Sequence, residues 1–228
     1  MPSHGSAVSF FVQARSPHNG FAPFKTHIID LEKPVDALFS NISSNGRYKI
    51  KRAEREGVLP VISVSPSSND VTAFADFFDE FARQKSLAVA NRAKLTALAE
   101  AQSLIVSSAS DQSREVLVMH AYVHDREIRR VRLLYSASHF RGSTDSALRN
   151  AIGRANRLLH WYEIEGLRSR GYLLYDLGGI PMDDSDAQKN AIARFKREFG
   201  GREVVEFNGF QAHSLLGSLV LMARRNPL

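Results

Sequence analysis

The stretch GRANRLLHWYEIEGLRSRGYLLYDLGGI (residues 153–180) decides the fold. Apolar and small residues recur on one face from Gly153 to Arg170, which predicts a long helix packed on a sheet. Gly171 ends that helix, because glycine readily takes the left-handed conformation there. Tyr172 to Asp176 then has the composition of a buried strand, and Gly178-Gly179 breaks it. Helix, strand and a second helix in this order indicate a sheet with helices on its faces.

The chain continues in the same style after this stretch. Asp184, Ser185 or Asp186 can cap a helix from Ala187 to Phe199, which Gly200-Gly201 ends. Val204 to Phe207 and Leu219 to Ala223 have strand composition.

Upstream, helix and strand signals also alternate. A strand is expected at Thr26 to Leu31, a charged helix at Arg47 to Gly57 and an edge strand at Val58 to Val64. Glu115 to His124 and Ile128 to Ser136 form a hairpin. A stripe of phenylalanines at helical spacing is expected in the core; its members are Phe74, Phe77, Phe78 and Phe81.

These signals predict an α/β (α+β) fold with a mixed, twisted sheet of about six or seven strands flanked by helices. Residues 1–23 are expected to be a loose lead-in with one short apolar patch at Val8 to Val12. Residues 24–228 are expected to form a single domain. Arg141 to Asn150 is expected to be a loop before the long helix.

The composition and the missing motifs exclude several kinds of chemistry. The chain has no cysteine, which excludes disulfides, thiolate metal sites and a cysteine nucleophile. It shows no apolar run long enough to span a bilayer and no signal peptide, so we expect a cytoplasmic protein. The motifs HExxH, GxxxxGK[ST], GxGxxG and GxSxG are all missing from the sequence, which removes the usual support for four large enzyme classes.

The net charge of +6 favours anionic partners such as phosphates, nucleotides or RNA. A solvated surface with a modest surplus of arginine explains the same number, and the two interpretations are equally good. Basic residues bunch in two places: Arg47, Lys49, Lys51, Arg52 and Arg55 in one, and Arg129, Arg130, Arg132, Arg141, Arg149 and Arg154 in the other.

A helix start near Gly153 would offer free backbone N–H groups to an anion. We therefore expect donor phosphates to bind at the first helical turn, which comprises Gly153, Arg154, Ala155 and Asn156. The segment from Asn150 to Ala155 also resembles the turn that holds the coenzyme A pyrophosphate in acetyltransferase-type enzymes, with asparagine in place of its first residue. Capping and surface charge are the alternative roles.

Two glycine-ended motifs, YDxGG and FKxxFGG, follow one another in this part of the chain. The residues that match them are Tyr175, Asp176, Gly178, Gly179, Phe195, Lys196, Phe199, Gly200 and Gly201. Together with the opening segments THIIDL and RYKIKRAEREGV, they resemble the FemAB-like branch of the GNAT N-acetyltransferase-like superfamily, over about residues 24 to 203.

That resemblance implies a GNAT-like fold and direct transfer of an aminoacyl or acyl group to an amine of a cell-envelope precursor or polysaccharide sugar. Aminoacyl-tRNA or acyl-CoA would be the donor substrate, with no bound cofactor. Peptidoglycan-bridge enzymes of the family carry two tandem domains, whereas this sequence has room for one, and a homodimer partner could take the place of the second. The alternatives are an acyl-CoA-dependent N-acetyltransferase of a small amine and a non-catalytic module that binds RNA or a protein partner.

Three residues are candidates for catalysis. Lys196 lies beside the apolar stripe of its helix, and the resemblance implies that it stabilises charge near the reacting ester; an ion pair to the sheet is the alternative. Asp176, at a strand end, could accept a proton, although a turn bond to the backbone of Gly178 or Gly179 is favoured. Tyr175 could donate a proton, but strand alternation points it away from Asp176.

Other polar side chains are candidates for substrate contacts. Arg47 and Lys51 share a helix face that could meet an anionic acceptor, and His160 could line a cleft. Exposed helix charge is the alternative for Arg47 and Lys51. Trp161 could line the same cleft as His160, and a core position is the alternative for Trp161. His120 and His124 could hold a metal, but no third ligand stands nearby in the sequence, so no metal site is expected.

Overall fold

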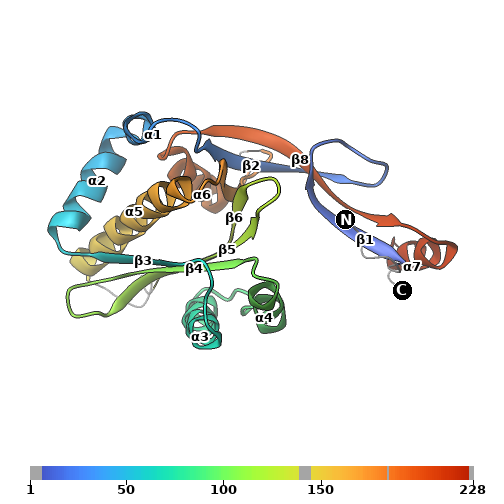
Figure 1. Ribbon diagram of the computed structural model, residues 1–228, viewed down its shortest axis with the longest axis horizontal. Helices are drawn as coiled ribbons and strands as arrows, with labels where there is room; N and C mark the ends of the chain where they lie inside the picture. Colours follow the sequence, from blue (N-terminus) through green and yellow to red (C-terminus); the bar gives the residue numbers. More distant parts are fainter. Residues whose placement is uncertain (1–6, 139–144, 184, 226–228) are drawn as a thin grey trace. The chain divides into compact units, whose positions relative to one another are not determined.

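Helices and strands alternate along the chain in the computed structural model, which describes residues 7–138, 145–183 and 185–225 (Figure 1). In chain order the elements are β1 (Val8–Ala14), β2 (Ala22–Asp30), α1 (Val35–Asn41), α2 (Ser44–Arg55), β3 (Leu59–Ser63), α3 (Ser68–Gln84), α4 (Arg92–Glu100), β4 (Leu104–Ser110), β5 (Val116–Asp125), β6 (Arg130–Ser138), α5 (Ser146–Ser169), β7 (Leu174–Gly179), α6 (Ala187–Arg197), β8 (Arg202–Ala212) and α7 (Leu215–Arg225). Among the described helices, none is both long and apolar enough to cross a membrane.

The chain divides into two compact units, and the larger comprises residues 28–178 and 194–202. Its sheet runs in the order β7-β6-β5-β4-β3, with the end of β2 beside β7. Neighbours from β3 to β6 are antiparallel, whereas β6 and β7 are parallel. The mixed sheet flanked by helices is therefore confirmed.

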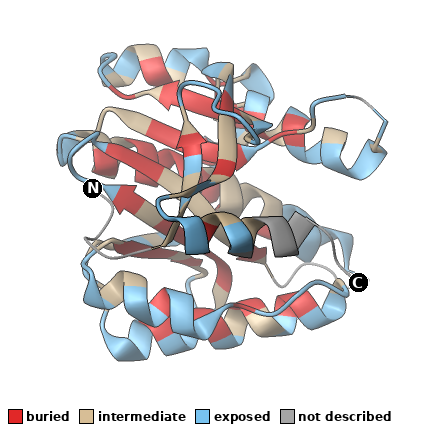
Figure 2. Ribbon diagram, turned by 90° about the vertical axis from the view of Figure 1, so that its right-hand side faces the viewer, coloured by how far each residue is buried: buried red, intermediate tan, exposed pale blue. Residues whose placement is uncertain are grey.

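Helices cover both faces of this sheet (Figure 1). The long helix α5 lies on one face with α2 beside it, and α3 and α4 lie on the other. Strand alternation sends Ile105, Tyr122 and Tyr175 to the α5 side, where they pack with Trp161. Figure 2 shows the result: buried residues run along the strands and along one side of the helices.

The phenylalanine stripe of α3 supplies the core on the opposite face. Phe74, Phe78 and Phe81 are buried there, whereas Phe77 is only partly buried at its margin. The predicted core role of the stripe is confirmed.

The smaller unit comprises the described residues of 1–27, 179–193 and 203–228. In it β1 pairs antiparallel with β8, from Val8 opposite Ala212 to Ala14 opposite Phe207. Residues 8–14, which the sequence placed in a loose lead-in, are thus a paired strand. The short apolar patch was the signal for that strand, since Phe10 packs against Phe210 with ring centroids 4.4 Å apart.

The start of the long helix differs from the prediction. Helix α5 begins at Ser146, with Asp145 as its N-cap accepting a hydrogen bond from the Ala147 N–H. The expected loop is therefore helical from residue 146, and Gly153 lies in the third turn. Asp145 is an ordinary capping residue, and a glycine inside a helix is tolerated at modest cost.

The last predicted strand is also wrong. Leu219 to Ala223 lies in α7, whose apolar residues follow a helical period from Leu215. The capping prediction for α6 fares better: the Asp186 carboxylate accepts from the N–H groups of Gln188 and Lys189. Asp184 and Arg141 lie outside the described residues.

Candidate active site at the end of β7

Strands β6 and β7 pair over a short length only. Their register joins Arg130 to Leu174, Val131 to Tyr175 and Arg132 to Asp176, and it ends there. Beyond this point the facing edges of the two central strands are released from their mutual ladder.

A buried ion pair ties the two strands where they part. Arg130 on β6 donates to the Asp176 carboxylate on β7 at 2.6 Å and 3.2 Å. The other carboxylate oxygen accepts from the Gly178 N–H at 2.8 Å. This is the turn bond that the sequence favoured for Asp176; its role as a proton acceptor stays a prediction.

Lys196 points at the same strand end. Its Nζ lies 3.9 Å from the place that a Cβ would take on Gly178, whose φ of +78° suits glycine. The lysine is 9% exposed. Burial lowers the pKa of its amine to about 8, against the opposing attraction of Asp176. A buried amine whose charge changes near pH 8 therefore lies beside β7, just past the last residue pair of the ladder between β6 and β7.

The turn that carries Lys196 is braced from α5. The Arg157 guanidinium donates hydrogen bonds to both carboxylate oxygens of Glu198, at 2.8 Å and 2.9 Å, and it lies over the Phe195 ring. The Ser43 N–H caps the turn by donating to the Glu198 carbonyl at 2.8 Å. Gly200 then leaves the helix at a φ of +72°. These contacts hold the C-terminal end of α6 in place. The residues of the FKxxFGG pattern are therefore those of a fixed helix end.

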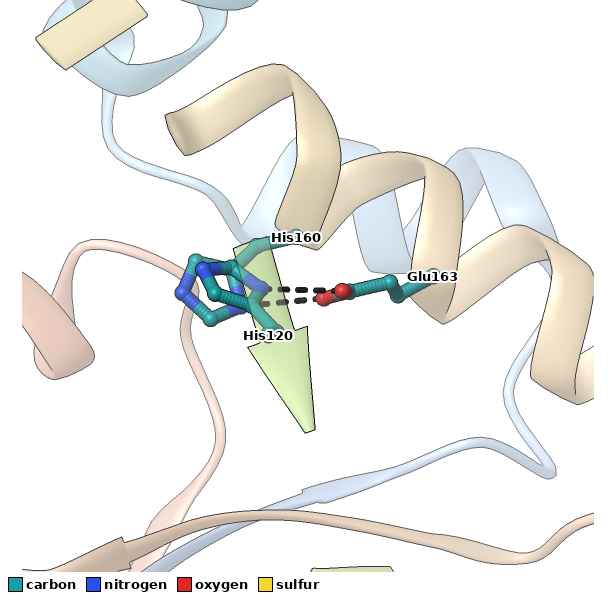
Figure 3. A group of neighbouring side chains, drawn as sticks. All are labelled: His120, His160 and Glu163. Carbon is teal, nitrogen blue, oxygen red and sulfur yellow. Dashed lines mark hydrogen bonds and ion pairs between the residues drawn. The ribbon is translucent and has the colours of Figure 1, made fainter. Parts of the chain in front are cut away.

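A second polar cluster surrounds the carboxylate of Glu163 on α5 (Figure 3). Tyr122 and Tyr175 donate to one oxygen at 2.5 Å and 2.6 Å. His120 contacts the other oxygen through Nδ1 at 2.9 Å, and Ser107 also donates to it. The Nδ1 of His160 lies 3.3 Å from the carboxylate. We call these residues, with Asn156, the Glu163 cluster; it joins α5 to β4, β5 and β7.

Every side chain at the centre of the Glu163 cluster is buried, which controls its protonation. Burial alone would raise the pKa of Glu163, but His120 and His160 hold it well below its usual range. Burial lowers the pKa of His160 to about 4, so this ring is neutral at pH 7. Burial and the Glu163 charge raise the pKa of Tyr122 and Tyr175, which stay protonated donors.

His120, His160 and Glu163 lie close enough for a shared metal ion, with ligand atoms within 4.8 Å of one another. Their geometry does not favour one. The Nδ1 atoms of both rings are directed at the Glu163 carboxylate, at 2.9 Å and 3.3 Å, which leaves no space for an ion between these three ligand atoms (Figure 3). The carboxylate also accepts hydroxyl and imidazole hydrogen bonds already. We read the cluster as a hydrogen-bond network.

The predicted phosphate turn is not a helix start. Gly153 to Asn156 lie inside α5, where their N–H groups belong to the helix ladder. Arg154 donates hydrogen bonds to both carboxylate oxygens of Glu56, at 2.7 Å and 2.9 Å. Ala155 is buried, and the Asn156 side chain lies 3.0 Å from the Nε2 of His120. The premise for phosphate binding here was wrong, because the helix begins seven residues earlier than Gly153.

The residues that were predicted to contact the acceptor substrate lie in two different places. Arg47 donates to the carbonyls of Ser40 and Ile42 at the end of α1, and Lys51 lies over the Phe39 ring. They share one face of α2, as expected. His160 is buried in the Glu163 cluster, and Trp161 is buried in the core, which is the alternative that the sequence offered for it.

Sequence reasoning missed Glu163, Tyr122 and Ser107. A signal existed: His160 and Glu163 are spaced i, i+3 on one face of a helix, and His120 and Tyr122 alternate on one face of a strand. Nothing in the sequence states that those two faces meet.

Comparison with known proteins bears on the fold. No protein-family model and no curated protein matches the sequence. Among solved structures, FemX is similar with a TM-score of 0.65 and 14% identity, over 93% of this chain and 64% of the FemX chain. L-PGS from Bacillus licheniformis is similar with a TM-score of 0.55 and 15% identity, over 90% of this chain and 66% of that one.

These similarities confirm the fold expected from the sequence motifs. The chain shares its fold with FemX and L-PGS. It spans less than two thirds of the length of FemX and about two thirds of the length of L-PGS.

Proposed function

We propose that this chain is an acyltransferase that moves an aminoacyl or acyl group directly to an amine of a cell-envelope precursor or polysaccharide sugar. The observation that carries the proposal is the buried amine of Lys196 beside Gly178, just past the last residue pair of the ladder between β6 and β7. The likeness of the fold to FemX supports the reaction class.

In the proposed reaction the acceptor nitrogen attacks the carbonyl carbon of the donor ester or thioester. The C–O or C–S bond breaks, and the proton lost by the nitrogen passes to the leaving oxygen or sulfur. Negative charge develops on the carbonyl oxygen in between. The protonated Lys196 amine and a backbone N–H of a parted strand would stabilise that charge, which is the largest contribution a fixed site of this kind can make.

The donor is aminoacyl-tRNA or acyl-CoA. The acyl-CoA alternative drew its sequence support from a phosphate turn at Gly153, and this segment is inside a helix. The net charge of +6 suits a polyanionic donor. We therefore favour aminoacyl-tRNA as the donor. The second candidate is an acyl-CoA-dependent N-acetyltransferase that acts on a small amine.

A transfer assay tests the proposal. Purified protein is mixed with labelled aminoacyl-tRNA or acyl-CoA and with amine acceptors, namely nucleotide-linked amino sugars and muropeptides. We expect transfer by the wild type and a loss of about 10²- to 10³-fold in kcat for Lys196→Ala. Lys189→Ala is the matched control, because Lys189 lies on the same helix with an exposed side chain.

The non-catalytic alternative makes the opposite prediction. A module that only binds RNA or a protein partner would transfer nothing with either donor. It would also keep its binding in the Lys196→Ala variant.

A further inference from the structure

We propose that the Glu163 cluster is a positioning device for Lys196: it locks the ring of His160, and that ring seats the end of α6 that carries the Lys196 amine. The inference rests on the proposed role of Lys196 and adds Glu163, Tyr122 and Ser107, which lie outside the YDxGG and FKxxFGG motifs.

The first step is the locking of His160. Its Nδ1 lies 2.7 Å from the Tyr175 hydroxyl, and that hydroxyl donates to Glu163 at 2.6 Å. Because Tyr175 uses its one proton on the carboxylate, the Nδ1 of His160 is the donor to the tyrosine oxygen. The tautomer and the orientation of the ring are thereby fixed from β7 and α5 together.

The second step is the contact with α6. The His160 ring packs against Phe195 at 5.6 Å and Phe199 at 5.1 Å between centroids, and the two phenylalanines contact each other at 5.4 Å. Lys196 lies between them in the sequence. A fixed imidazole therefore supports the turn on which the lysine stands.

The third step is electrostatic. Burial gives the lysine its low pKa, so the packing that excludes water is also what sets its charge. A neutral His160 adds no second positive charge beside the amine. The titratable and charged groups around the two residues include Glu163 and Arg157 on α5, His120 and Tyr122 on β5, Tyr175 and Asp176 on β7, Arg130 on β6, and Glu198 just after α6.

A buried carboxylate with this many polar partners calls for such an explanation. Apolar residues of similar volume stabilise a core as well or better than a buried ionic group does. A satisfied polar network instead fixes one arrangement of its side chains. The Glu163 cluster fixes the ring on which the helix end rests.

The chain offers a matched pair of variants for the test. Tyr175→Phe and Tyr172→Phe each remove one hydroxyl that lies 2.7 Å from the Nδ1 of a histidine, His160 and His124 respectively. The Tyr172–His124 pair is outside the Glu163 cluster. Glu163→Gln, which keeps the shape of the side chain, is a second variant of the cluster.

The readout is the reactivity of the Lys196 amine, which needs no substrate. Trace labelling of the folded protein with acetic anhydride across pH 6 to 10, read by mass spectrometry of the Lys196 peptide, gives the fraction of neutral amine. We expect Tyr175→Phe and Glu163→Gln to admit water and raise the pKa of Lys196. A rise from 8 to about 9 slows labelling at pH 8 about fivefold.

We expect the control variant Tyr172→Phe to keep the wild-type pH profile of Lys196 labelling. Unchanged Lys196 profiles in folded Tyr175→Phe and Glu163→Gln overturn the proposal, and so does an equal shift in Tyr172→Phe. If Glu163→Gln does not fold, Tyr175→Phe decides alone, since it loses a single oxygen atom. Because no donor or acceptor is present, the result stands apart from the success or failure of the transfer assay.

Discussion

Lys196 gives the proposed activity a characteristic pH dependence. Its amine has a pKa of about 8, so the cationic form needed to stabilise an oxyanion is lost as the pH rises through that value. We expect kcat/KM to fall above pH 8 in the wild type. Lys196→Arg keeps a charge at all these pH values, so its descending limb moves to higher pH.

Profiles of kcat/KM from pH 6 to 10 in both proteins check this expectation. Deprotonation of the acceptor amine adds a rising limb, but that limb is common to the two proteins and cancels in their comparison. An identical descending limb in Lys196→Arg would show that another group controls it.

The same lysine costs stability. Its pKa is about 8 in the folded chain against an ordinary lysine pKa of 10.5, so the unfolded chain binds more protons between these two pH values. Stability therefore rises with pH through this window, by about 3 kcal/mol at most for a shift of this size. We expect Lys196→Met to be more stable than the wild type at pH 7 and to lack that rise.

Urea denaturation at pH 7 and pH 10 measures this difference. The gain in free energy of unfolding at pH 7 should shrink at pH 10, where the wild-type lysine is neutral when folded. A variant that is less stable at pH 7 would mean that the attraction of Asp176 outweighs the cost of burying the charge.

At the scale of the element, the end of α6 depends on one glycine. Gly200 has a φ of +72°, and a Cβ there would lie 2.9 Å from the Cβ of Asn41 and 3.0 Å from its carbonyl oxygen. Gly171 has a similar φ of +83° with nothing within 4 Å of its Cβ position. We expect Gly171→Ala to cost about 1 kcal/mol from backbone strain alone, and Gly200→Ala to cost clearly more.

Thermal or urea unfolding of the two variants separates strain from crowding. Equal losses would indicate that Asn41 shifts without cost. Gly200→Ala should also reduce transfer more than Gly171→Ala does, because it displaces the turn that follows Lys196.

Elements were predictable from the sequence to different degrees. The hairpin of β5 and β6, the end of α5 and the strand end at Gly178-Gly179 follow from local signals: alternation, a terminal glycine and a broken apolar run. The start of α5 was missed because Asp145 and Gly153 are both acceptable start signals, and only the structure shows which one caps the helix.

The residues of the candidate site were likewise predictable from the sequence to different degrees. Lys196 and the turn bond of Asp176 were accessible, since each depends on a helix period or a tight turn. The Glu163 cluster was not, because it depends on the contact of α5 with β4 and β5, whose residues Ser107 and His120 lie 56 and 43 positions from Glu163 in the sequence. Long-range pairing of this kind has no local signal.

At the scale of the whole molecule, charge separates the two donors. The chain carries a net charge of +6, and a tRNA presents many phosphates where an acyl-CoA presents few. Each phosphate neutralised on binding releases counterions, so the logarithm of the binding constant falls with the logarithm of salt concentration in proportion to the number of phosphates contacted. We expect a steep slope for aminoacyl-tRNA, corresponding to several phosphates.

Donor binding measured between 50 and 300 mM salt, by filter retention for aminoacyl-tRNA and by calorimetry for acyl-CoA, provides that slope. Lys196→Ala should keep the tRNA slope nearly unchanged, because one buried amine is a small part of a many-phosphate contact while it is central to the chemistry. Saturable acyl-CoA binding with a shallow slope, and no tRNA binding at 50 mM salt, would reverse our order of donors. The positive charge would then be that of a solvated surface, which is the alternative that the sequence left open.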